Sequence, residues 1–209
     1  MRTWHALPIA VVCLLSVASP AVARTIAPAS LVPRPLELPG FGFAQTTIQS
    51  ATTPQKYVEK LLEDNPAEVR KEARLLGREG FREGVRELFS TEHTEATAIT
   101  AVFSGPRGAK GELGRATSEE LKYTPAAERF QDPAVPGSLG FLAAGSTKAS
   151  AGHPSEPFRY ANLFFRSGRC MFFIGDTFSG ASATNEELER APLAGATALF
   201  ARIKHLCAG

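Results

Sequence analysis

The sequence predicts an α+β domain in which N-terminal and C-terminal helices cover one face of an antiparallel β-sheet. The clearest sign is a hairpin: two β-rich runs, residues 160–165 and 169–176, are separated by Ser167-Gly168, with glycine where the turn needs a positive φ. Residues 96–103 are rich in Thr, Ile and Val and predict another strand. Amphipathic helical patterns precede and follow these strands, so helices would cover the sheet.

The first 23 residues have the order of a cleavable secretory signal peptide. Arg2 gives a basic start, an uncharged stretch runs from Ala6 to Ala18, and Ala21-Val22-Ala23 supplies small residues before a cut. The stretch is shorter than the roughly 20 residues that span a bilayer. A buried N-terminal helix is the alternative. We expect a secreted protein, extracellular or periplasmic, whose mature chain begins at or near Arg24 and has no integral membrane segment.

The remaining chain divides into a proline-rich segment and one domain. Residues 24–53 contain Pro28, Pro33, Pro35 and Pro39, which disfavour a long helix. We expect an arm or linker here, with at most a short strand near residues 43–48. Residues 54–209 are long enough for a single α+β domain with its own hydrophobic core.

Two helices are expected to open the domain. Thr53 is a candidate N-cap and Pro54 sits at the first helical position. Asn65-Pro66 repeats this signal for a second helix, which Gly77 would end. Residues 80–90 fit a strand or a helix, and their two glycines favour the strand.

The later elements alternate with irregular chain. A short helix is expected over residues 107–121 and a short strand over 139–143, within a stretch rich in proline and glycine. The chain ends in an amphipathic helix that Pro192 would open, with Ala196, Phe200, Ile203 and Cys207 on one stripe.

The hairpin pattern places a wholly apolar set of side chains on one face of the sheet. A two-residue loop at Ser167-Gly168 would set Phe165 opposite Cys170, and side chains alternate between faces along each strand. The terminal helix should pack on this face with Cys207 in its stripe. Because an even pair of cysteines in an oxidising compartment is most simply a disulfide, we predict a Cys170–Cys207 bond. Two buried free thiols are the alternative.

The other face of the hairpin carries the candidate ligand-binding residues. Large apolar side chains share it with polar ones, a mixture typical of ligand pockets. The simpler interpretation is a second layer of core with arginines at its rim. The candidates are Phe164, Met171, Phe173, Arg166 and Asn162, with Arg169 beside them.

Composition and motifs argue against several function classes. A formal net charge of +2 lacks the basic excess typical of nucleic-acid binding, so we expect no nucleic-acid partner. The run 92–95 holds one histidine and predicts no metal site. The glycines of 105–111 do not follow the nucleotide-binding Gly-x-x-x-x-Gly-Lys-Ser/Thr pattern, and 177–181 is not a nucleophile elbow. We therefore expect no metal, no cofactor and no local set of catalytic residues.

The element order resembles small exported bacterial proteins and lipoproteins with a PsbP/Mog1-like α+β fold. The resemblance rests on Gly80-Phe81-x-x-Gly84, on Gly108-Ala109 opening a helix, and on Asn162-Leu163-Phe164-Phe165-x-x-Gly168 before a terminal helix. It covers about residues 66–206, and it implies a helix-covered antiparallel sheet and no catalytic residues. The lipid-anchoring cysteine of the lipoproteins is absent here.

These observations favour a non-enzymatic exported domain. It would bind a small amphiphilic ligand or a cell-envelope partner through the face at Phe164, Met171 and Phe173. A second interpretation is a secreted hydrolase whose site is assembled from distant residues such as His93, His153 and Asp176. A structural envelope protein without a ligand is the third.

Overall fold

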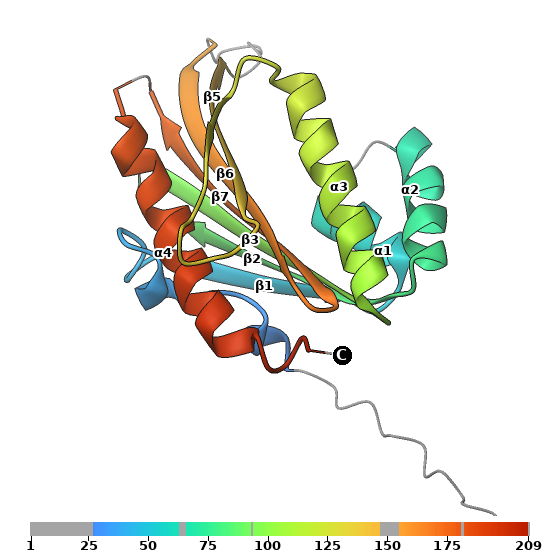
Figure 1. Cartoon of the computed structure of the whole chain (residues 1–209). Coiled ribbons are helices and arrows are strands. Elements are labelled where there is room, and N and C mark those ends of the chain that lie inside the picture. Colours follow the sequence, from blue (N-terminus) through green and yellow to red (C-terminus); the bar gives the residue numbers. More distant parts are fainter. Residues whose placement is uncertain (1–26, 63–65, 93, 147–154, 181, 209) are drawn as a thin grey trace, which may run out of the picture.

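The computed structural model describes residues 27–62, 66–92, 94–146, 155–180 and 182–208. Its centre is a seven-stranded sheet, antiparallel throughout, with the order β1-β2-β3-β7-β6-β5-β4 (Figure 1). The α+β class is thus confirmed. The strands are β1 (Gln45–Ala51), β2 (Phe81–Ser90), β3 (Thr94–Phe103), β4 (Glu128–Phe130), β5 (Leu139–Ser146), β6 (Pro157–Ser167) and β7 (Cys170–Ser179). The helices are α1 (Pro54–Tyr57), which continues as the π-helix η3 (Val58–Leu62), α2 (Pro66–Arg78), α3 (Pro106–Tyr123) and α4 (Asn185–Ile203).

Helices cover both faces of the sheet, where one covered face was expected. α4 packs on one face, called face A, with Leu199 and Ile203 in a cluster that includes Phe172. α1, η3, α2 and α3 pack on the opposite face, called face B, where Leu61 and Leu76 share a cluster with Met171 and Phe164 (Figure 1). The reason lies in the central strands: residues 100–103 of β3 and 170–172 of β7 are buried at consecutive positions, as in strands covered on both sides.

The described part of the proline-rich segment is built into the domain rather than extending as an arm. Its short 3-10 helices, η1 (Pro28–Ser30) and η2 (Pro35–Glu37), alternate with buried apolar residues of the face A core, namely Leu31, Val32, Leu38 and Phe41. Side chains of the domain also bind its backbone, because the Thr100 hydroxyl donates to the Leu31 carbonyl and Arg202 donates to that of Val32. The prolines exclude a long helix, but the residues between them are core residues.

The β6–β7 hairpin forms with a register shifted by two residues from the expected one. Its turn is Gly168-Arg169, so Phe165 lies opposite Phe172 and Ser167 opposite Cys170. Gly168 has a φ of +51°. A shift of two residues leaves every side chain on the same face of the sheet. The predicted apolar face is therefore correct although the predicted register is not.

The Cys170–Cys207 disulfide is confirmed. The two Cα atoms are 5.6 Å apart and the bond closes a separation of 37 residues. Both cysteines are buried in the face A core. Cys207 lies in the turn after α4 rather than on the helix itself. The bond therefore fastens the end of the chain to the hairpin turn, where Arg169 N also donates to the Cys207 carbonyl.

The terminal helix begins seven residues before Pro192, which was expected to open it. Thr184 is the N-cap, and its side chain and that of Glu187 bond each other's backbone N–H groups in a capping box. Pro192 is buried in the helix interior, where one backbone donor is lost. The start of the first helix was predicted correctly, since the Thr53 hydroxyl caps α1 by accepting from Lys56 N.

Candidate functional site

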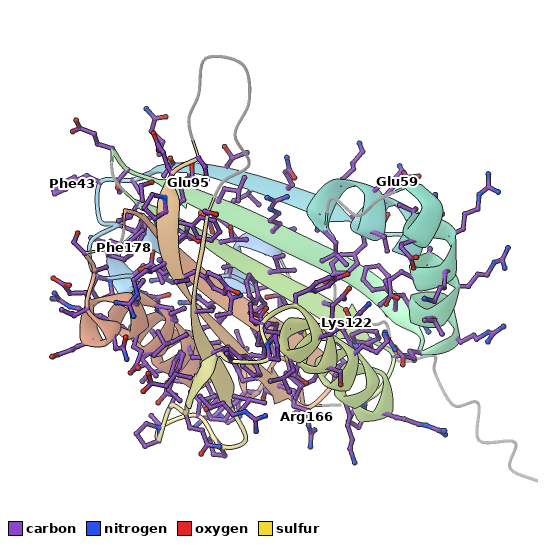
Figure 2. The ribbon with its side chains drawn as sticks, turned by 90° about the horizontal axis from the view of Figure 1, so that it is seen from above. Phe43, Glu59, Glu95, Lys122, Arg166 and Phe178 are labelled. Carbon is purple, nitrogen blue, oxygen red and sulfur yellow. A yellow bond between two sulfur atoms is a disulfide. The ribbon has the colours of Figure 1, made fainter. Side chains whose placement is uncertain are left out.

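The predicted ligand-binding residues all lie on face B, but they differ in how far the helices bury them. Phe164 and Met171 are buried in the core beneath the helices, and the Phe164 ring centroid lies 5.0 Å from that of Phe173. Asn162 and Phe173 are half-buried, and Arg166 is exposed near the hairpin turn (Figure 2). The two hollows described below are lined by other residues. The role of these five residues in ligand binding stays a prediction.

Asn162 is held in place by α3. Its Nδ2 donates to Glu120 Oε2 at 3.1 Å, and the Tyr160 hydroxyl donates to Glu120 Oε1 at 3.2 Å. Gly175 lies opposite Asn162, and a Cβ there would approach both the Asn162 amide oxygen and the Phe173 ring to 2.7 Å. Glycine therefore makes room for both side chains, and Glu120 fastens the last turns of α3 to β6.

Face B over β1, β2 and β3 is divided: the helices pack over the end at Ala51, Phe81 and Phe103, whereas the other end is left open. The register places two rows of side chains across these strands, and all of them are exposed or half-buried. Figure 2 shows Glu95 at the end of the sheet away from Glu59 and the helices beside it. We call this surface the open half-face; it consists of Gln45, Thr47, Leu88, Ser90, Glu95 and Thr97.

A hollow of about 180 Å³ lies on the open half-face. Leu88 supplies its apolar side chain, and Gln45, Thr47 and Ser90 surround it with amide and hydroxyl groups that can both donate and accept hydrogen bonds. Glu95 is the one charged residue of the lining. Phe89 and Ala96 are its remaining residues. A lining that combines apolar side chains, uncharged polar groups and one carboxylate suits a hydrogen-bonding molecule with an apolar part and no negative charge.

The residues of the open half-face escaped prediction for a physical reason. They come from three strands, β1, β2 and β3, which pair with one another only in three dimensions, and β1 was expected only as a short strand inside an arm. One signal was present. Val85, Glu87 and Phe89 point to one face of β2, so Leu88, which lies between Glu87 and Phe89 in the sequence, places an apolar side chain on the opposite face.

A second, wider hollow of about 320 Å³ lies between α1 and α2, lined by Thr53, Pro54, Gln55, Arg70, Ala73 and Arg74. Arg70 and Arg74 are one helical turn apart and both are exposed. Because α1 is only four residues long, it does not enclose the hollow, and the two arginine side chains stay in contact with solvent.

Asp176, a candidate for the hydrolase interpretation, lies on face A and is only 1% exposed. Ala96 and Ala161 flank it on the neighbouring strands. Burial raises the pKa of its carboxyl to about 7, against a smaller lowering by the backbone N–H of Thr177. A substrate cannot reach this carboxyl without the core opening. His93 and His153 lie outside the described residues.

The buried Asp176 carboxyl gives a testable pH dependence. Its pKa is higher in the folded chain than in the unfolded chain, so its contribution to stability is lost as the pH rises toward about 7. Glu87 and Glu112 have pKa values raised by burial to about 7 as well, and they act in the same direction. We expect the wild type to be less stable at pH 8 than at pH 5, and Asp176→Asn to reduce that difference by about 2–3 kcal/mol. Urea unfolding of both proteins at the two pH values measures this, and equal pH dependence would contradict it.

Comparisons with known proteins leave the family open. No family model matches the chain, and no curated protein matches it. A search of solved structures finds the extracellular domain of PknH from Mycobacterium tuberculosis, with a TM-score of 0.40, 7% sequence identity, and coverage of 75% of this chain and 81% of that chain. A TM-score this low does not establish a shared fold, and nothing about this chain follows from it. The resemblance to the PsbP/Mog1 group stays a prediction.

Two further features are absent from the described residues. None of the helices in this part of the chain is long and apolar enough to cross a membrane. Within the same residues, no three His, Cys, Asp or Glu side chains are grouped so that they could hold a metal ion.

Proposed function

We propose that the protein is a non-enzymatic exported domain that binds a small, uncharged amphiphilic ligand on the open half-face. The observation that carries the proposal is the unequal cover of the sheet. α4 and residues 27–44 cover face A, whereas helices cover face B only in part and leave Leu88 in the lining of a hollow. The hollow is small, at about 180 Å³, so we expect it to hold the junction between the polar and the apolar part of a ligand.

Export is supported by two features that do not depend on each other. The N-terminal 23 residues have the pattern of a signal peptide. The Cys170–Cys207 disulfide suits an oxidising compartment outside the cytoplasm.

The non-enzymatic part of the proposal is supported by the chemistry of the hollow. Glu95 is the only titratable side chain that lines it. Acid–base or nucleophilic catalysis usually needs a second group within hydrogen-bond reach of the first. Together with the burial of Asp176, this favours binding over hydrolysis.

Replacing Leu88 tests the proposed site. Octyl glucoside monomers, kept below the micelle-forming concentration, provide a neutral sugar head with an apolar tail. We expect Leu88→Lys to raise the Kd for this probe at least about tenfold, because a charged amine must be desolvated where the alkyl chain lay. Isothermal titration calorimetry measures the Kd.

Tyr123→Lys is the matched control, because it also exchanges a large exposed side chain for lysine but at the end of α3. It should leave the Kd unchanged. Equal effects of the two substitutions, or no binding by the wild type, would contradict the proposed site.

A further inference from the structure

β1 is an edge strand without the usual protection. Among the described strands it pairs only with β2, so the N–H and C=O groups of its outer side are left for a partner. Natural edge strands are blunted by charged side chains, prolines, bulges or short length. β1 has seven residues, an unbroken register with β2, and neither a charge nor a proline. The edge strand at the other side, β4, has three residues and carries Glu128 and Arg129.

The missing protection extends beyond the strand. Charged residues make up 21% of the chain, yet none occurs between Glu37 and Lys56. β1 occupies the middle of this uncharged segment. A partner strand could therefore approach the edge without burying a charge.

Exposed apolar side chains occur within this segment, at Phe43 and Ile48, and just before it, at Leu36. The described residues include five large hydrophobic side chains that are exposed, and three of them are Leu36, Phe43 and Ile48. Leu36 contacts Gly42, where an added Cβ would be 3.4 Å from the leucine methyl group, so Leu36 lies beside the turn that carries Phe43. Figure 2 shows Phe43 at the outside of the domain. Clustered apolar side chains beside an open strand edge are typical of an interface.

We propose that β1 pairs antiparallel with β1 of a second copy, joining two seven-stranded sheets into one continuous sheet about a two-fold axis at Ile48. Ile48 is the fourth of the seven residues, so the pairing is symmetric about it and uses the full strand. It sets Ile48 against Ile48 of the second copy, Thr47 against Gln49, and Thr46 against Ser50.

The strand is self-complementary in a way that favours a second copy over an unlike partner. None of the cross-strand pairs brings like charges together, and the central pair joins two β-branched side chains. Ile48, which is 46% exposed in the single chain, would be covered at the axis. Because opposite residues point to the same side of a sheet, the open half-faces of both copies would adjoin and form one longer surface.

Charge placed at the axis tests this pairing. Ile48→Lys and Ile48→Glu each put two like charges opposite one another, and each is expected to raise the dimer Kd at least about tenfold. An equimolar mixture of the two variants should restore dimers, since it sets lysine against glutamate. Sedimentation equilibrium of the full chain measures all three samples, with Tyr123→Lys as the control that leaves dimerisation unchanged.

A second pair of variants tests the register at exposed positions that the fold tolerates. Thr46→Lys with Ser50→Glu places opposite charges across the axis twice, whereas Thr46→Lys with Ser50→Lys places like charges there. The first double variant should dimerise at least as well as the wild type and the second should be monomeric. A wild type that stays monomeric at all concentrations, or two double variants that behave alike, would overturn the proposal.

Discussion

Replacing both Cys170 and Cys207 with alanine is expected to lower the free energy of unfolding by about 3–4 kcal/mol. The disulfide closes a loop of 37 residues, and the loss of that constraint on the unfolded chain accounts for a value of this size. The bond also fastens the end of the chain to the β6–β7 turn, so α4 would lose its anchor on face A. Urea unfolding at pH 7 of the oxidised wild type and the double variant measures the difference.

Reduction of the wild type provides the internal control for this prediction. The wild type in excess reductant should unfold at nearly the same urea concentration as the double alanine variant. If reduction leaves the midpoint unchanged, the bond does not contribute as expected.

Replacing Arg115 with glutamine is expected to lower the free energy of unfolding by about 3 kcal/mol at pH 8. The Arg115 guanidinium binds three carboxylates. It donates two hydrogen bonds to Glu79, of which the one from Nη2 is 2.7 Å long. It also donates one of 3.1 Å to Glu72 Oε1 and one to Glu112. Glutamine would leave these carboxylates facing each other, and Glu112 is almost fully buried.

The loss at Arg115 should be smaller at low pH. Burial raises the pKa of Glu112 to about 7, although the Arg115 charge lowers it, so this carboxyl takes up a proton below neutral pH. The repulsion left by Arg115→Gln then weakens, and the variant should recover part of its stability at pH 5. Lys71→Gln is the control, because the exposed Lys71–Glu68 pair at 3.3 Å contributes little at any pH. An equal loss at both pH values would contradict the assigned proton uptake.

The sequence predicted those parts of the fold that local pattern determines. The hairpin, the strands over 81–90 and 94–103, the Thr53 cap and the Cys170–Cys207 bond depend on alternation, on turn chemistry and on pairing of two cysteines. The hairpin register was wrong by two residues, yet the face assignment held, because strand side chains repeat every two positions.

The sequence did not predict features that depend on contacts between distant segments. Gly108 and Gly111 of the 105–111 run are one example, since they allow α3 to pack closely on Glu79, the residue after α2. A Cβ on Gly108 would lie 2.4 Å from the Glu79 carbonyl oxygen, and one on Gly111 would lie 2.3 Å from the Glu79 carboxylate. Such approaches have no local signature.

The predicted ligand-binding residues lie on the expected face, and their role in binding stays a prediction. Phe164, Met171 and Phe173 do lie on the face opposite the terminal helix, but α3 and its neighbours pack over Phe164 and Met171. The open part of the face lies over one end of β1–β3, because cover is decided by where helices from elsewhere in the chain dock. Hydrophobic alternation identifies a face of a strand and does not show which stretch of it stays open.

The most direct test of ligand binding on the open half-face is a two-dimensional ¹H–¹⁵N NMR titration of the mature protein with octyl glucoside monomers. Binding at the proposed site predicts progressive shift changes confined to the amides of β1–β3 around Gln45, Thr47, Leu88, Ser90 and Glu95. Shift changes centred on the α1–α2 hollow at Arg70 and Arg74, or no changes at all, would contradict it.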